Sequence, residues 1–492
     1  MGANPLATPP DTLAALDALA ERARHELAMT AYPAKSWVKP LPGRDAADVI
    51  DVLIVGAGQS GMACALALRR DGIDNVLLID ENPAGTEGPW ETYARMIELR
   101  TPKFTVGMDM GIPSLTAQSW FETRYGREAW AAITRVPRQD WMNYLRWYRR
   151  VLDLPIRNEV RVTGIEPAAD CLRVFTASND GAGALLARRV ILATGYDGSG
   201  HWQIPDFIRT AVAPERLLHS NQVFDCAALR GLRVGMLGHG ASAFDTAGAL
   251  LEAGVGSVDL CYRRQQIPTI NPHRWIESAG FLKHYPELSD DIRWQTAYHF
   301  ETADQPPTQR SFDNASRHAN FRRHPGTPWL RVEDNGRTVK VHTPHTVFEF
   351  DFIIAATGSQ PDLAARPELA AIEAQILRWA DMYQPPPALV NPVLGLYPYL
   401  GPHYELRERT PGSAPWLSHI HAYSFAAYVS QGPHSTSISG HRHSIPRMIR
   451  SITRSFFMEQ QGSMVESLKA YDEAELVVPD TPAGATRTQH AA

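Results

Sequence analysis

The feature that most constrains this chain is a glycine-rich turn directly after an apolar strand. Residues 51–58 (DVLIVGAG) form an apolar run broken by glycine, which is typical of a buried parallel strand entering a tight turn. Gly56, Gly58 and Gly61 give the spacing G-x-G-x-x-G, a helical pattern follows, and a second strand ends at Asp80. Strand, turn, helix, strand and terminal acid in this order predict a βαβ unit that binds a dinucleotide.

Each part of this unit has a separate task. The first glycine permits the tight turn, the second lets a pyrophosphate approach the backbone, and the third lets the helix pack on the strand. Gln59 and Ser60 begin the helix, where free amides and the helix dipole favour phosphate. Asp80 suits a ribose hydroxyl as a hydrogen-bond acceptor. We expect these residues and the adjacent Glu81 to contact the nucleotide.

The same unit recurs in residues 232–264. The start of its helix carries the predicted contact residues Gly238, Gly240, Ala241, Ser242 and Ala243. Alanine in the third glycine position is an accepted variant. The second strand is followed by Arg263 and Arg264 instead of an acid, and guanidinium groups suit a 2′-phosphate, which favours NADPH over NADH. The alternative is that these arginines only close a surface strand.

Two copies of one unit predict an α/β fold with two Rossmann-like dinucleotide-binding domains, the second inserted in the first. We predict the first domain at residues 49–214 and 346–480, the second with an insertion at 215–345, and a flexible tail at 481–492. Residues 1–48 form an N-terminal extension with a helix at 11–29, which packs either on the body or on a second subunit in a homodimer.

Composition excludes several classes of protein. With 48 basic and 53 acidic residues the net charge is −5, so neither nucleic acid nor an anionic membrane is favoured as a partner. The four cysteines form no C-x-x-C and the 18 histidines fit no zinc pattern, so no metal site is expected. No apolar run reaches about 18 residues and no signal peptide is recognisable, which predicts a cytoplasmic protein.

Three further motifs follow the first glycine turn. Trp90 comes directly after the first unit, residues 192–196 read LATGY, and residues 356–358 repeat Ala-Thr-Gly. In this order, from about Asp51 to Leu468, the chain resembles the flavoprotein monooxygenases with two dinucleotide-binding domains, which include flavin-containing, N-hydroxylating and Baeyer–Villiger enzymes. The resemblance implies FAD at the first turn and NADPH at the second, with further cofactor contacts from Trp90, Thr194, Gly195 and Tyr196.

The resemblance also implies an enzyme and a reaction. NADPH reduces FAD, O₂ adds to the reduced flavin as a C4a-(hydro)peroxide, and one oxygen atom passes to a small-molecule substrate. The Baeyer–Villiger fingerprint is degenerate, because Ala213 and Glu215 occupy its Phe and Gly positions. Oxygenation at nitrogen or sulfur is therefore favoured. Ketone oxygenation and a flavin oxidase or reductase without oxygen transfer remain the alternatives.

Arg100 is the candidate catalytic residue. It stands where the flavin-containing family has an asparagine near the flavin. A guanidinium there would stabilise a peroxy-anion. An ion-pair partner with a purely structural role fits the sequence equally well.

Overall fold

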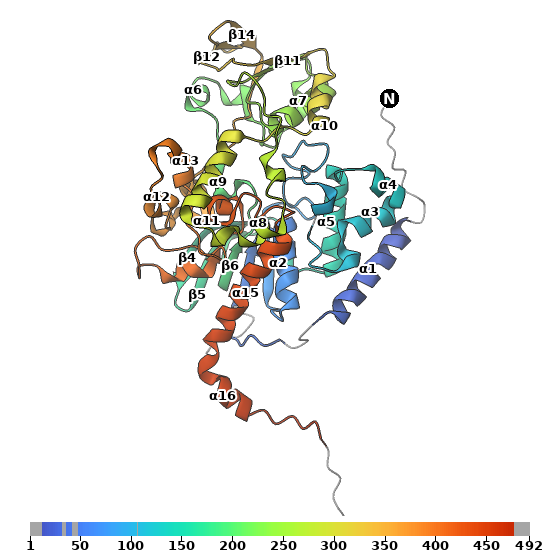
Figure 1. The fold of residues 1–492 in the computed structure, drawn as a ribbon, viewed down its shortest axis with the longest axis vertical. Coiled ribbons are helices and arrows are strands. Elements are labelled where there is room, and N and C mark those ends of the chain that lie inside the picture. Colours follow the sequence, from blue (N-terminus) through green and yellow to red (C-terminus); the bar gives the residue numbers. More distant parts are fainter. Residues whose placement is uncertain (1–11, 32–35, 42–47, 106, 477–492) are drawn as a thin grey trace, which may run out of the picture.

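Two β-sheets, one for each glycine turn, organise the molecule (Figure 1). The first is mixed, with parallel strands at its centre, and the second is parallel. The computed structural model describes residues 12–31, 36–41, 48–105 and 107–476. The predicted flexible tail at 481–492 lies outside them. The α/β class and the N-terminal helix are confirmed.

The first sheet has the strand order β3-β2-β1-β6-β5-β4, and β17 also pairs with β6. Its parallel centre is buried on both faces, which explains the unbroken apolar runs in the sequence. Its strands and the helix after the first turn are β1 Ile50–Val55, α2 Gln59–Arg70, β2 Val76–Ile79, β3 Ile156–Arg157, β4 Val160–Ala168, β5 Cys171–Ser178, β6 Gly181–Leu192 and β17 Ile420–His421.

The second sheet is inserted between β6 and β17 and has the order β11-β10-β9-β15-β8. Its strands and the helix after the second turn are β8 Leu217–His219, β9 Arg233–Leu237, α7 Ala241–Ala253, β10 Ser257–Cys261, β11 Phe321–His324 and β15 Phe352–Ala355. The strand β15 pairs with both β9 and β8, although it lies beyond the domain boundary that the sequence suggested at residue 346. A small antiparallel sheet precedes it, formed by β12 Arg331–Asp334, β13 Val339–His342 and β14 Val347–Phe350.

The N-terminal helix α1 (Thr12–Met29) packs on the body of the same chain. It lies against α3 (Ala117–Tyr125) and α5 (Arg138–Leu152), beyond which lies the short helix α4 (Arg127–Ala132). Leu16 and Leu19 are buried there, and the indole of Trp147 donates to the Leu16 carbonyl at 3.3 Å. Of the two arrangements open at the sequence level, α1 therefore takes the intramolecular one.

The insertion after β10 packs both on the second sheet's helix α7 and on the C-terminal segment of the chain. Its last helix, α10 (Gln309–Ser316), packs on α7, whereas α9 (Asp290–Ala303) packs on α13 (Pro392–Gly395) and α14 (Tyr428–Gln431). Trp294 of α9 shares an apolar cluster with Trp379 and Tyr397 of the C-terminal segment. The remaining helices and short strands are β7 Gly200–Trp202, α6 Asp206–Arg209, α8 Ala279–His284, β16 Ser359–Pro361, α11 Pro367–Ala370, α12 Trp379–Met382, α15 His441–Glu459 and α16 Gln461–Lys469.

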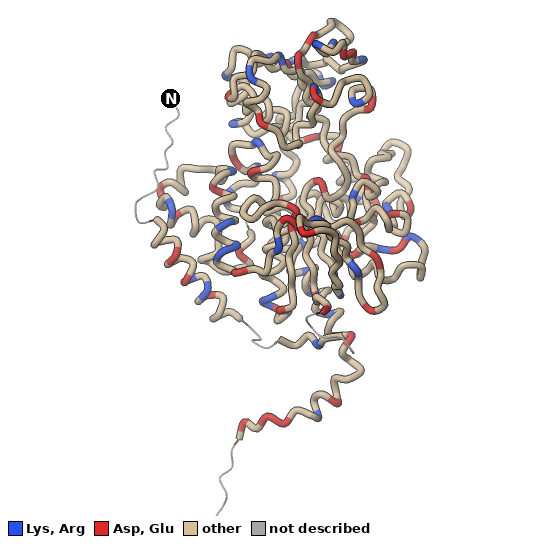
Figure 2. Tube along the Cα trace, turned by 180° about the vertical axis from the view of Figure 1, so that it is seen from behind, with Lys and Arg blue, Asp and Glu red and all other residues tan. Residues whose placement is uncertain are grey.

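The surface carries charges of both signs. Figure 2 shows Lys and Arg interspersed with Asp and Glu in both lobes. Within the described ranges, no helix combines the length and apolarity needed to cross a bilayer. The same residues contain no group of three or more His, Cys, Asp or Glu side chains arranged to hold a metal ion.

Candidate active site

Both glycine turns open into one cavity of about 1410 Å³. The turn after β1 and the turn after β9 each lie at the carboxyl end of a parallel strand, where α/β sheets bind their ligands. A nucleotide on each turn would therefore lie in the same cavity.

The first turn accepts only glycine at two of its positions. Gly56 has φ +101°, and a Cβ there would lie 2.5 Å from the Ala193 carbonyl oxygen. A Cβ at Gly61 would lie 1.9 Å from the Gly56 carbonyl oxygen, so the helix could not approach the strand. By contrast, a Cβ at Gly58 would find its nearest atom at 3.7 Å, which leaves the backbone open to a pyrophosphate.

Asp80 holds this turn in place from the next strand. One carboxylate oxygen accepts from the Ala57 amide at 2.8 Å, and the other accepts from the Asn82 amide at 2.9 Å. Burial raises the pKa of Asp80, and the two amides oppose that shift. Asp80 thus organises the glycine turn and lies at the cavity wall, where a ribose would pass.

The second turn repeats this geometry with more open space. Gly238 has φ +132°, and a Cβ there would lie 2.2 Å from the Ala356 carbonyl oxygen. A Cβ at Gly240 would meet nothing within 4 Å. Gly240 is also the N-cap of α7, so free helix amides face that space. Both turns thus fit the phosphates of a dinucleotide.

Most of the predicted site residues come together in the cavity. Those that line it are Gly56, Gly58, Gln59, Ser60, Asp80, Glu81, Trp90, Arg100, Thr194, Gly195, Tyr196, Gly238, Gly240, Ala241, Ser242 and Arg263. Gly61 and Ala243 instead pack their helices against the strands. Arg264 is not among the lining residues, and its guanidinium donates to the Thr302 carbonyl at 2.6 Å. Of the two arginines, only Arg263 faces the space where a 2′-phosphate would lie.

Trp90 and Arg100 both touch the cavity and both have partners elsewhere. The Trp90 ring is 8% exposed and meets Trp141 of α5 edge-on at 6.3 Å. The Arg100 guanidinium donates to the carboxylate of Asp245 at 2.9 Å, and Asp245 also accepts from the Ser311 hydroxyl. Arg100 therefore borders the cavity and also forms an ion pair between the loop after the first βαβ unit and α7 of the second.

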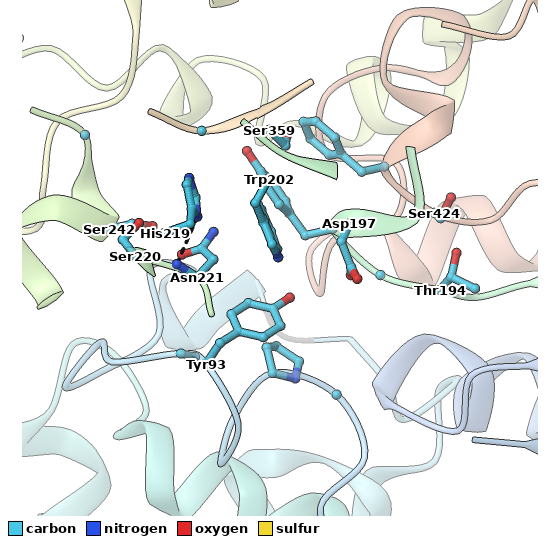
Figure 3. Close-up of a pocket in the computed structure, with 18 of the residues that line it drawn as sticks. Tyr93, Thr194, Asp197, Trp202, His219, Ser220, Asn221, Ser242, Ser359 and Ser424 are labelled. Carbon is cyan, nitrogen blue, oxygen red and sulfur yellow. Dashed lines mark hydrogen bonds between the residues drawn. The ribbon is translucent and has the colours of Figure 1, made fainter. Parts of the chain in front are cut away.

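A stack of rings lines the cavity, and of its members Tyr196 was predicted from the sequence. Trp202 lies parallel to His219 at 5.5 Å and to Tyr196 at 5.6 Å, and Tyr93 meets Trp202 edge-on at 5.4 Å. Figure 3 shows Tyr93, Trp202 and His219 gathered there. Burial lowers the pKa of His219 to about 4, so its imidazole is neutral near pH 7. The only sequence signal for Trp202 was its place shortly after the LATGY segment.

The cysteines take no part in this site. All four lie within the described residues as free thiols, and none lines the cavity. Cys64 is fully buried in α2, and burial raises the pKa of its thiol. A reductase that passes electrons through a cysteine pair at the flavin would need a different arrangement.

Comparison with known proteins gives matches over most of the chain. The family described as pyridine nucleotide-disulphide oxidoreductase matches residues 53–280. The FAD-dependent urate hydroxylase of Xanthomonas campestris pv. campestris is 43% identical over 456 residues, which cover 92% of this chain and 96% of that protein.

Two solved structures share the fold. The ornithine hydroxylase of Pseudomonas aeruginosa superposes with a TM-score of 0.66 at 18% identity, over 82% of this chain and 99% of that one. The ornithine N-hydroxylase of Kutzneria sp. 744, solved with reduced FAD, NADP⁺ and L-ornithine, gives a TM-score of 0.63 at 16% identity, over 83% and 99% of the two chains.

Proposed function

Because this chain belongs to the family of the FAD-dependent urate hydroxylase, we propose that it uses FAD and NADPH to transfer one oxygen atom of O₂ to urate or a closely related oxidised purine. The observation that carries the proposal is the shared cavity: both dinucleotide turns open into it beside a wall of aromatic side chains. The 43% identity to the FAD-dependent urate hydroxylase, over 92% of this chain, supports a urate-like substrate.

The residues present fit both cofactors. FAD would lie on the turn of Gly56 and Gly58, and NADPH on the turn of Gly240, with Arg263 toward its 2′-phosphate. Bound FAD would supply the centre that accepts a hydride from NADPH and activates O₂. The protein's part is to bind, to orient and to exclude water.

Several side chains are placed for that part. Thr194 and Ser220 line the cavity (Figure 3), and their buried hydroxyl oxygens have no hydrogen-bond partner in the described structure. The neutral His219 lies beside Ser220 and brings no charge to the middle of the cavity. The stack of Trp202 and Tyr196 keeps that region apolar, which limits water near the reacting groups.

Nothing in the site favours the two alternative reactions. The substrates named for the relatives, urate and ornithine, both carry nitrogen, in agreement with the expected preference for a nitrogen compound over a ketone. A disulfide reductase would need a cysteine pair at the cavity, and none of the four cysteines lines it.

We place the enzyme in the cytoplasm, where NADPH is available and where its four free thiols stay reduced. A homodimer remains a prediction, although α1 packs within its own chain. Light scattering on the purified protein would test the oligomeric state.

The proposed activity is tested on the purified FAD-loaded chain. NADPH oxidation, O₂ consumption and urate loss are followed together, and hydrogen peroxide is measured at the end. We expect urate to accelerate NADPH oxidation and to disappear in step with it. If urate is unchanged while all consumed NADPH appears as hydrogen peroxide, the proposal is wrong.

A further inference from the structure

One side of the cavity serves neither glycine turn. Its wall is aromatic: Tyr196 lies 4.3 Å from Phe425, Phe425 lies 5.0 Å from Tyr428, and Tyr428 stacks on Tyr397 at 5.6 Å. All four rings line the cavity. Tyr196 follows β6, whereas Tyr397, Phe425 and Tyr428 lie between residue 397 and α14. Neither nucleotide turn contributes a ring to this wall.

The carboxylate of Glu301 stands among these rings. Glu301 lies on α9, lines the cavity and is exposed to it. Its helix, α9, packs on α14, which carries Tyr428. Burial and the charge of Glu301 raise the pKa of Tyr196, Tyr397 and Tyr428. Burial and the neighbouring Asp304 raise the pKa of Glu301.

Glu301 differs from Asp304 in its partners. The Asp304 carboxylate lies 3.1 Å from the His239 imidazole. Burial is the largest influence and raises the pKa of Asp304, but His239, the Gln305 amide and Arg264 together outweigh it, so the pKa is lowered. In the part of the chain that the structure describes, no Lys, Arg or His forms an ion pair with Glu301. A hydrogen bond from the Tyr428 hydroxyl opposes the rise in the pKa of Glu301, and the carboxylate has further lone pairs that can accept from a ligand.

Positive charge reaches the same region from Arg100. Burial, Arg274 and Arg100 together lower the pKa of His273 to about 4, and the His273 ring stacks on His434 at 4.5 Å. Arg100 also acts on Tyr196. Arg100 is itself paired with Asp245, so its positive charge beside a ligand at Glu301 is largely offset.

We propose that Glu301 and the rings of Tyr196, Tyr397, Phe425 and Tyr428 form the substrate subsite, which takes a planar heterocycle with ring N–H groups. The rings stack on the heterocycle, and Glu301 accepts its N–H. The inference deepens the proposed function and rests on it.

The test measures urate binding to the oxidised FAD-loaded enzyme by calorimetry, beside urate turnover. E301Q keeps the shape of the side chain and removes the anionic acceptor, so urate should bind about 10- to 100-fold more weakly. FAD content and NADPH-driven flavin reduction without urate should stay at the wild-type level. E301D, with a shorter carboxylate, serves as the second variant if E301Q loses FAD.

Glu287 offers a matched control. It lies in the same insertion, its side chain is 72% exposed and it does not line the cavity, so E287Q should bind urate like the wild type. Singly N-methylated urates extend the test: wild type should discriminate against the isomer that lacks the accepted N–H, and E301Q should not.

The outcomes separate the two claims. If E301Q binds urate within about twofold of wild type, the subsite is overturned while the urate hydroxylase activity stands. If wild type binds urate through Glu301 but does not oxidise it, the subsite stands and the proposed function falls. If wild type binds ornithine and not urate, both are overturned.

Discussion

The guanidinium of Arg100 donates to the carboxylate of Asp245 at 2.9 Å, and this contact joins the loop after the first dinucleotide unit to α7 of the second. Asp245 is buried, and its other oxygen accepts from Ser311. Loss of Arg100 would leave a buried carboxylate short of a cation, which is costly. The contact therefore couples the positions of the two nucleotide turns.

Arg100→Ala and Asp245→Asn should consequently have the same effect. We expect each to raise the KM for NADPH and to increase the fraction of NADPH lost as hydrogen peroxide. The double variant should be little worse than either single one, with a coupling energy of about 0.5–3 kcal/mol. If Arg100→Ala uncouples the reaction and Asp245→Asn does not, Arg100 acts directly on oxygen transfer.

Two glycines in equivalent motifs should respond differently to alanine. At Gly61 the new Cβ would lie 1.9 Å from a carbonyl oxygen, so G61A should lose FAD and destabilise the fold by about 1–3 kcal/mol or more. At Gly240 it would meet nothing within 4 Å of protein, so G240A should keep its FAD and melting temperature. The alanine would still occupy the space of the pyrophosphate, and the Kd for NADPH should rise about tenfold or more. A G240A enzyme with normal NADPH affinity would contradict the placement of that cofactor.

The two arginines after β10 should be unequal. Arg263 lines the cavity, whereas Arg264 donates to the Thr302 carbonyl. We expect R263A to reduce the preference for NADPH over NADH by about 10- to 100-fold, because charge-assisted bonds to a phosphate are lost. R264A should change that preference far less. Comparison of kcat/KM for the two nucleotides in each variant measures the effect, and the reverse ranking would show that Arg264 reads the phosphate.

Stability should fall on acidification through the buried histidines. Burial lowers the pKa of His219, His421 and His441 from 6.5 to about 4. These side chains are neutral when folded but take up protons when unfolded, so their contribution is complete above pH 6.5 and is lost as the pH falls toward 4. Thermal melting across this range should show a steady fall in Tm. His421→Gln should flatten the fall, and a Tm that is constant down to pH 5 would contradict the buried neutral state.

The sequence alone determined the two βαβ units and the N-terminal helix. Their signals are local: an apolar run, glycines at fixed spacing and helical periodicity fall within about 30 residues of each other. For the same reason the cavity-lining residues of both turns, from Gly56 to Glu81 and from Gly238 to Ser242, could be named before the fold was seen.

Tertiary structure decided the rest, because those features join residues that are distant in sequence. The Ala-Thr-Gly repeat at residues 356–358 was visible in the sequence, but not that the strand before it, β15, pairs with β9 and β8. Arg100 was found by its position, and its partner Asp245 lies 145 residues away. Glu301 carried no motif at all; it lines the same cavity as Tyr196, Tyr397 and Tyr428 because α9 packs on the C-terminal segment.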